Sequence, residues 1–260
     1  MSRLCAWGHK GLLTHLMLYL LLASAALLSG GCASRNATQS EANVDPFEVI
    51  NRPIYQFNDL TDRYILRPVG KGYNYITPRP VRNGIGNFFD NITYPGTIIN
   101  GFLQAEFKQG FSDIGRFFVN STFGLLGFFD VASYTGIPRH DEDFGQTFAV
   151  WGVPSGPYIV VPLLGPRTVR SGIGTLADIR VNPLLQYDNS SVRDKLLILW
   201  TIESRASLIG PDEVIYDAFD PYLFIRDAYL QNRAFLINNG NMGVSGLPDM
   251  EFDDDFDDDF

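Results

Sequence analysis

The sequence predicts an all-α protein built from short, broken helices, with at most a small hairpin. Apolar residues recur near helical spacing in the first part of the chain after residue 44, at Phe47, Ile50, Ile54, Phe57 and Ile65. Glycines and prolines interrupt the long apolar runs. Sustained strand alternation is missing, except in the short segment YIVV at 158–161. Together these patterns favour helices joined by irregular connections.

The composition is rich in aromatic residues, with 20 Phe, 12 Tyr and 3 Trp among 260 residues. This composition fits either a Phe-rich soluble core or a membrane-associated body with amphipathic rings at the interface. The net charge is −9, and much of it comes from the C-terminal segment DMEFDDDFDDDF. The sequence has no basic stripe, so nucleic-acid binding lacks its main electrostatic contribution.

The N-terminus has the pattern of a targeting segment. Arg3 and Lys10 precede GLLTHLMLYLLLASAALL, a run without formal charge. The following LLSGGCAS resembles a bacterial lipoprotein signal, which implies removal of residues 1–31 and lipidation of Cys32. Conventional cleavage near ASA at 23–25 and an uncleaved membrane anchor are the alternatives. Ala33 is not the aspartate typical of inner-membrane retention, so we expect sorting to the outer membrane.

The rest of the chain divides into three parts. Residues 32–44 are small and polar and are expected to form a lipidated, flexible tether. Residues 45–233 are dense in apolar and aromatic residues and form the expected helical domain. Residues 234–260 end in an acidic repeat, and we expect a disordered tail because its acids repel one another and bury little apolar surface.

The first helix is expected to open at the DPFE motif. Asp45 is predicted to be the N-cap, Pro46 the first helical residue and Glu48 an acid in the first turn. Farther along, the segment from Arg79 to Gly136 is expected to form short helices broken at Pro95 and at glycines.

Two later segments predict firmer helices, at 193–208 and from Asp220 onward, where Asp-Pro again marks a helix start. Residues 117–129 carry no charge but are too short to span a bilayer alone. They fit either a buried core helix or a segment set part-way into lipid.

The segment from Asp143 to Pro166 has one formal charge, four glycines and four prolines. It therefore cannot be one long helix. Its glycines permit close turns, and its aromatic residues are suited to an interface.

Catalytic motifs are mostly missing. After signal removal, His140 is the only histidine, and it is followed by Asp141, Glu142 and Asp143. One histidine without a second, spaced ligand indicates a solvated polar turn rather than a metal site. The segment GIGTLA at 172–177 fits a dinucleotide pattern, but the preceding GPRTVRS does not indicate a strand. We therefore expect no catalytic residue, no cofactor and no metal.

Five segments, in order and extending over 45–233, resemble the MlaA/VacJ family of outer-membrane lipoproteins. They are DPFEVINRPIYQFND (45–59), RPVRNGIGNFFDNITYPGTIIN (79–100), RFFVNSTFGLLGFFDVA (116–132), EDFGQTFAVWGVPSGPYIVVPLLGP (142–166) and DPYLFIRDAYLQNR (220–233). One departure is Ser171, where an acid usually follows the arginine.

The resemblance implies a ring-shaped helical body, embedded in the outer membrane of a Gram-negative bacterium and lipid-anchored from the periplasmic side. Members of the family remove glycerophospholipids from the outer leaflet through a central channel. They pass these lipids to a periplasmic carrier protein and associate with trimeric porins. A porin-bound structural lipoprotein without transport activity is the alternative, and a phospholipid-cleaving enzyme is disfavoured by the lone His140.

The resemblance also suggests site residues. Phe57 and Asn58 match a segment where small changes disturb gating, so they are expected to hold the channel closed. The loop 135–147 matches a flexible hairpin near the channel. The residues expected to act as its hinge are Gly136, Pro138 and Gly145.

Two further aromatic residues, Trp151 and Tyr158, are expected at the channel wall or at the membrane interface. Ordinary packing is the alternative for every one of these residues.

Overall fold

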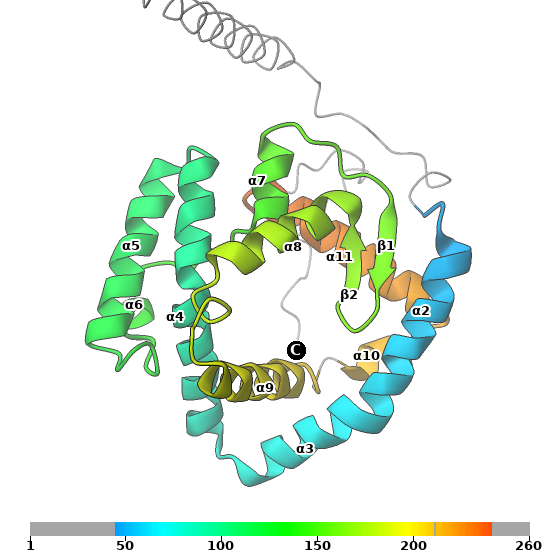
Figure 1. Cartoon of the computed structure of the whole chain (residues 1–260), viewed down its shortest axis with the longest axis horizontal. Coiled ribbons are helices and arrows are strands. Elements are labelled where there is room, and N and C mark those ends of the chain that lie inside the picture. The colour runs from blue at the N-terminus through cyan, green and yellow to red at the C-terminus, as the bar shows by residue number, and fades with distance from the viewer. Residues whose placement is uncertain (1–44, 211, 241–260) are drawn as a thin grey trace, which may run out of the picture. The chain divides into compact units, whose positions relative to one another are not determined.

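The computed structural model describes residues 45–210 and 212–240. Cys32, the signal 1–31 and the tether 32–44 lie outside the described residues, as does most of the expected tail. The described chain is mainly helical, with one two-stranded antiparallel sheet, as the sequence predicts. Within residues 45–240 the ribbons follow one another around a ring (Figure 1).

The elements follow the chain in a simple order. Their bounds are α2 Glu48–Thr61, η2 Asp62–Leu66, α3 Arg67–Ile76, α4 Arg79–Leu103, α5 Phe107–Thr122, α6 Val131–Tyr134, α7 Phe144–Val150, β1 Tyr158–Val161, β2 Gly165–Thr168, α8 Val169–Val181, α9 Ser190–Ser207, α10 Asp212–Tyr216 and α11 Pro221–Ile237. α11 thus continues beyond the expected domain boundary at residue 233.

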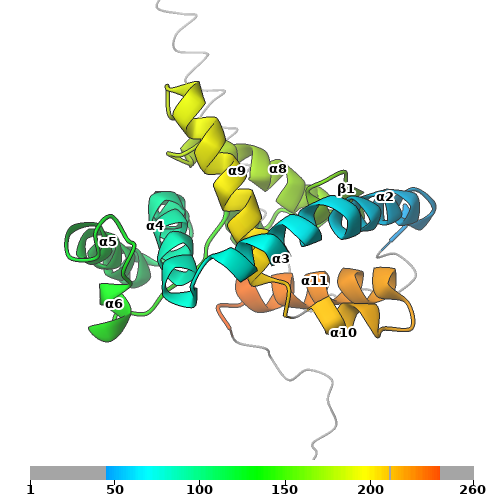
Figure 2. The ribbon, with the colours of Figure 1, turned by 90° about the horizontal axis from the view of Figure 1, so that it is seen from below.

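α2, η2 and α3 form one continuous helical stretch in which η2 is a π-helical turn. Viewed from below, α10 and α11 lie in a second layer beneath α2 and α3 (Figure 2). α3 packs closely on α9, because Gly70 has no side chain to hold the two backbones apart. A Cβ at Gly70 would lie 3.4 Å from the Cα of Ala206.

The predicted N-cap role of Asp45 is wrong. α2 begins at Glu48, and Phe47 precedes it without a side-chain cap. The Asp45 carboxylate instead accepts a hydrogen bond from Asn51 at 2.8 Å and another from the hydroxyl of Tyr222 on α11. The position of the Asp45 side chain therefore depends on α11, which packs the end of the described chain against its beginning.

The start of α11 has the Asp-Pro arrangement that the sequence predicts for a helix start. The Asp220 carboxylate accepts the N–H groups of Tyr222 and Leu223 at 3.0 and 3.2 Å, and Pro221 is the first helical residue. The predicted cap is therefore confirmed here. Asp220 also pairs with Arg52 on α2 at 2.9 Å, which adds a second contact between the two helices.

The predicted break at Pro95 is wrong, because α4 runs through it from Arg79 to Leu103. Packing holds the helix on both sides of the proline. Before it, the Asn91 amide donates to the Ser121 hydroxyl at 2.9 Å. After it, Asn100 accepts a hydrogen bond from Thr147 at 2.7 Å. These tertiary contacts outweigh the loss of one backbone hydrogen bond.

Residues 117–129 do not form one helix. α5 ends at Thr122, and Leu125, Leu126 and Gly127 have positive φ angles in the turn that follows. The large apolar side chains here are exposed or half-buried, and none is fully buried, with Phe123 76% exposed. The buried-core interpretation is therefore wrong for this segment.

The charge-poor segment 143–166 is divided as its glycines and prolines predict. It contains α7, an irregular connection, β1 and the turn into β2. β1 pairs with β2 with Tyr158 opposite Thr168 and Val161 opposite Gly165. The predicted strand at 158–161 is therefore confirmed.

Candidate functional site

Two asparagines on α2 hold the edge of β1. The Asn51 amide donates to the Tyr158 carbonyl at 3.1 Å, and Asn51 Oδ1 accepts the Val160 N–H at 2.9 Å. Asn58 lies two helical turns later on the same face. It donates to the Val161 carbonyl at 3.0 Å and accepts the Leu163 N–H at 2.8 Å. The hairpin is thereby fastened to α2 along its length.

The two predicted gate residues take different environments. The Asn58 side chain is hydrogen-bonded to the hairpin. It lines a hollow of about 210 Å³ that Tyr158 also lines. The Phe57 side chain is 52% exposed and does not line this hollow. The structure thus brings Asn58 and Tyr158 together, whereas Phe57 points elsewhere.

Trp151 and Tyr158 also have contrasting positions. Tyr158 is 1% exposed and packs against Tyr222 with ring centres 6.3 Å apart. Trp151 follows α7 and is largely exposed, and its indole N–H donates to the Leu103 carbonyl at 3.0 Å. An exposed ring with a satisfied polar tip suits an interface, whereas Tyr158 belongs to the packed core.

The predicted hinge loop is tied down by polar contacts. The Arg116 guanidinium donates to the Ile137 carbonyl at 2.8 Å, and Arg139 pairs with Asp90 at 2.6 Å. Glu142 accepts hydrogen bonds from Gln104 at 2.8 Å and from Gln109 at 2.9 Å.

Within this loop, Gly136 has φ +78°, a conformation that glycine adopts without strain, and Pro138 follows two residues later. Gly145 lies in α7 rather than in the loop. A Cβ at Gly145 would meet the Ser171 Cα at 3.0 Å, and a Cβ at Gly174 would meet the Gly145 nitrogen at 2.4 Å. Gly145 therefore allows α7 and α8 to approach, and the hinge hypothesis rests on Gly136 and Pro138.

Asp143 joins α7 to α11. Its carboxylate accepts the Gln146 N–H at 2.8 Å as the cap of α7 and binds the Arg233 guanidinium at 2.5 and 2.9 Å. Burial by itself raises the pKa of this carboxyl, but the bonds from Arg233 outweigh it and hold the pKa below its usual value.

The expectation that His140 lies in a solvated turn is wrong. Its Nδ1 lies 2.8 Å from Asp113 Oδ1, and the Tyr94 hydroxyl donates to the same oxygen at 2.7 Å. Asp113 is fully buried. Over residues 45–210 and 212–240, no three His, Cys, Asp or Glu side chains form a group that could hold a metal ion.

Two residues have structural roles that the sequence did not predict. Arg205 on α9 binds Asp62 in η2 at 2.7 Å and Asp212 in α10 at 2.6 Å, so it links three elements. Ser171, which departs from the family pattern, is buried. It forms a capping box with Thr168 at the start of α8 and lies 2.6 Å from the Tyr229 hydroxyl.

The distribution of apolar and polar side chains is inverted relative to an ordinary soluble domain. In the described part of the chain, buried polar residues outnumber buried apolar ones. They include Asn51, Asn91, Asn100, Asn120, Gln104, Gln146 and Thr147.

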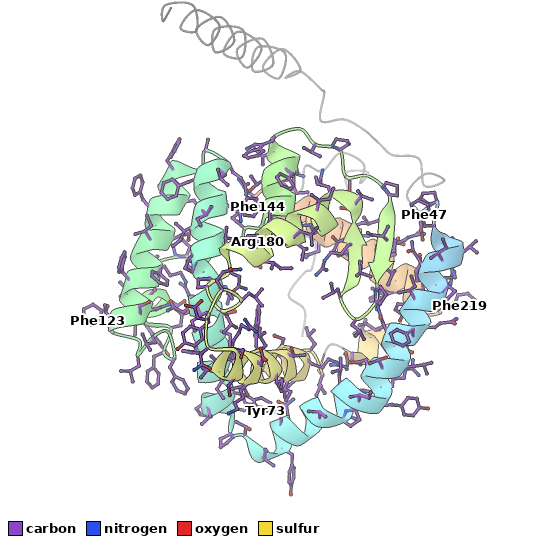
Figure 3. All side chains as sticks on the ribbon, viewed as in Figure 1. Phe47, Tyr73, Phe123, Phe144, Arg180 and Phe219 are labelled. Carbon is purple, nitrogen blue, oxygen red and sulfur yellow. The ribbon has the colours of Figure 1, made fainter. Side chains whose placement is uncertain are left out.

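Large apolar side chains are instead exposed. Phe47, Phe123 and Phe219 lie at the outer rim of the ring (Figure 3). On α5 the exposed residues Phe107, Phe111 and Phe118 recur near helical spacing. Within the described residues, no helix combines the length and apolarity needed to cross a bilayer.

A hollow of about 840 Å³ lies between α4, α9 and the segment 128–134. Asn87 and Ser204 face it from the two helices, and the rings of Phe129 and Trp200 line its apolar part. Mixed linings of this kind accommodate amphipathic ligands.

These features define a class of protein, a helical ring with polar contacts between its helices and an exposed apolar surface. Such an arrangement is suited to surroundings of lipid instead of water. The family model for the MlaA lipoprotein matches residues 43–236, and the chain belongs to this family.

Named relatives agree with this assignment. The chain is 36% identical over 234 residues to the intermembrane phospholipid transport system lipoprotein MlaA of Escherichia coli (strain K12), covering 88% of this chain and 92% of the relative. It is 35% identical over 244 residues to the protein of that name from Haemophilus influenzae, covering 91% and 96%.

The fold is also similar to a solved structure reported as the structural basis for maintenance of bacterial outer membrane lipid asymmetry. The TM-score is 0.66 at 35% identity, and the match covers 75% of this chain and 99% of the other.

Proposed function

We propose that this protein is an outer-membrane lipoprotein that removes mislocalised glycerophospholipids from the outer leaflet. It passes them through the centre of the ring to a periplasmic carrier protein and so maintains lipid asymmetry. The observation that carries the proposal is the inverted side-chain distribution of a chain in the MlaA lipoprotein family. The free energy falls when lipid replaces water around exposed rings such as Phe118 and Phe123.

Attachment to the membrane has two parts in this proposal. Acyl chains on Cys32 anchor the mature chain from the periplasmic side, and the tether 32–44 lets the helical domain embed. The acyl chains hold only the N-terminus at the membrane, and the exposed apolar side chains supply the second contribution, which embeds the helical domain. Mass spectrometry of the mature protein tests the anchor, because an unacylated Cys32 would contradict it.

The proposal assigns no covalent step and no cofactor to the protein, since lipid is moved and not cleaved. Trimeric porins are the proposed membrane partners. Asn58 is the stronger of the two gate residues, because it fixes the hairpin to α2. Gly136 and Pro138 are the proposed hinge.

A deletion strain tests the transport function. Outer-leaflet phosphatidylethanolamine is measured with a membrane-impermeant amine reagent, after rescue by the wild type or by Ser204→Trp. The introduced ring fills the hollow between α4 and α9. Ser191→Trp, at the exposed start of the same helix, is the matched control.

The proposal expects clearance by the wild type and by Ser191→Trp, and accumulation of outer-leaflet lipid with Ser204→Trp. Equal rescue by all three proteins would instead favour a structural lipoprotein that binds porins without moving lipid. Absence of any effect of deletion on outer-leaflet lipid would overturn the function.

A further inference from the structure

A second hollow, of about 400 Å³, lies between α3, the start of α4 and the end of α9. It shares the lining residues Asn83, Glu203 and Ser207 with the hollow of about 840 Å³, so the two hollows adjoin, and together they are called the recess. The smaller part is polar and includes the guanidinium groups of Arg79 and Arg82. The recess therefore has a polar, charged end and a larger end with an apolar wall.

Glu203 stands at the junction of the two parts without a cation. Burial raises the pKa of its carboxyl, and the neighbouring charge of Asp90, also negative, raises it further. Among the described residues no basic side chain lies within ion-pair distance of it, whereas Asp90 and Asp130, which line the larger part, pair with arginines on neighbouring segments. A half-buried carboxylate beside another acid favours a cationic partner.

Tyr73 adds a second unsatisfied group. Its hydroxyl is buried and has no hydrogen-bond partner among the described residues. Tyr73, Arg82 and Glu203 all line the smaller hollow. Burial raises the pKa of the phenol, Glu203 raises it further and Arg82 lowers it. Figure 3 shows Tyr73 in the region where α3 meets α9. An unsatisfied phenol in this position can donate to a bound anion.

The positive side of the polar end comes from α4. Arg79 is the first residue of the helix and is exposed, and Arg82 donates to the backbone carbonyl and side-chain oxygen of Asn74 through one nitrogen. Within the described residues neither guanidinium group has an acidic partner, so their remaining N–H groups can donate to an anion. The parallel N–H groups of a guanidinium can form two hydrogen bonds with the oxygens of one phosphate.

We propose that this recess binds a phosphoethanolamine headgroup, with the ammonium on Glu203 and the phosphate on Arg79 and Arg82. The Tyr73 hydroxyl donates to the phosphate, and the acyl chains lie along Phe129 and Trp200 in the larger part. This inference rests on the proposed function and gives it a substrate preference. An anionic headgroup without an ammonium would leave Glu203 unpaired beside Asp90, so it is bound more weakly.

Binding of short-chain phosphatidylethanolamine and phosphatidylglycerol to the purified full-length protein in detergent tests the inference. Affinities are measured by isothermal titration calorimetry for the wild type, Glu203→Gln and the control Asp194→Asn. Asp194 lies on the same helix, outside the recess, and its side chain is exposed.

The wild type is expected to prefer phosphatidylethanolamine. Glu203→Gln should weaken that binding about tenfold, because a charge-assisted hydrogen bond is lost, and leave phosphatidylglycerol unchanged. Asp194→Asn should bind both lipids like the wild type. Equal wild-type affinities for the two lipids, or unchanged binding by Glu203→Gln, would overturn the headgroup site.

Gly86→Ala gives an independent variant from the opposite helix. Its Cβ would lie 2.8 Å from Glu203 Oε1, so the carboxylate has to move. We expect the same selective loss of phosphatidylethanolamine binding, and retained selectivity would contradict the site. In the deletion strain, both variants are expected to clear outer-leaflet phosphatidylethanolamine less completely than the wild type, whereas Asp194→Asn should clear it normally. Failure of the wild type to clear lipid would instead overturn the proposed function.

Discussion

Asn58 binds the turn of the hairpin through Leu163, whose backbone N–H donates to Asn58 Oδ1 at 2.8 Å. The same side chain donates to the Val161 carbonyl at 3.0 Å, so one residue satisfies the donor and the acceptor that flank the end of β1. The neighbouring Phe57 makes no such contact and is exposed. The structure therefore separates two adjacent residues for which the sequence suggested one role.

Asn58→Ala is expected to release the hairpin turn. Loss of two hydrogen bonds, each worth about 1 kcal/mol net, should increase hydrogen exchange at the Leu163 amide about thirtyfold. Hydrogen-exchange mass spectrometry measures the effect. Phe57→Ala should leave this exchange unchanged, and a similar increase in both variants would show that the hairpin responds to α2 as a whole.

Gly174→Ala is expected to force α7 and α8 apart, because the new Cβ would lie 2.4 Å from the Gly145 nitrogen and backbone cannot rotate away. The free energy of unfolding should fall by about 2–3 kcal/mol, as in other overpacked sites. Gly115→Ala in α5 is the matched control, since its Cβ would meet nothing within 4 Å. It should stabilise the helix by up to about 1 kcal/mol in thermal unfolding. Equal thermal unfolding midpoints for Gly174→Ala and Gly115→Ala would contradict the close approach of α7 and α8.

Asp178 should make the stability depend on pH. Burial raises the pKa of its carboxyl to about 6, and the carboxylate accepts the Phe144 N–H at 3.1 Å. The pKa of Asp178 in the folded protein lies above the unfolded value of about 3.9. The protonated carboxyl therefore adds to the free energy of unfolding, and this contribution is complete below about pH 4. It is lost as the pH rises through about 6.

Asp178→Asn removes this effect while keeping an oxygen for the Phe144 N–H. We expect the variant to match the wild type at pH 4 and to exceed its free energy of unfolding by about 1 kcal/mol at pH 7, after allowance for solvent screening. Thermal unfolding at the two pH values measures the difference, and Asp194→Asn is the control. A difference that is the same at both pH values would show that titration of Asp178 is not its cause.

Phe118→Asp should weaken membrane association, because Phe118 is 61% exposed on α5. Removing one ring from lipid costs about 1.5–3 kcal/mol of transfer free energy, and the introduced charge adds to that cost. Flotation with phospholipid vesicles measures the change in a Cys32→Ser background, which lacks the proposed acyl anchor. Ser191→Asp adds the same charge at the exposed start of α9 and should have little effect. Equal flotation of the two variants would place the α5 surface outside the lipid.

The sequence predicted the elements whose signals are local. The helix predicted over 193–208 is α9, which runs from Ser190 to Ser207, Asp220 caps α11, and the segment YIVV is β1. Hydrogen bonds between neighbours in the chain and the spacing of apolar residues determine these features, so they can be read without knowing the fold. The five matching segments also sufficed to identify the family.

By itself, then, the sequence determined the helical class, the family and the division of 143–166 by its glycines and prolines. The tertiary structure decided where Asp45 binds, that α4 continues through Pro95, and that His140 contacts the buried Asp113. It also decided that Tyr158 is core while Trp151 is exposed. The physical reason is that each of these outcomes depends on a partner far away in the chain, and the free energy of such contacts exceeds the local preference that the sequence expresses.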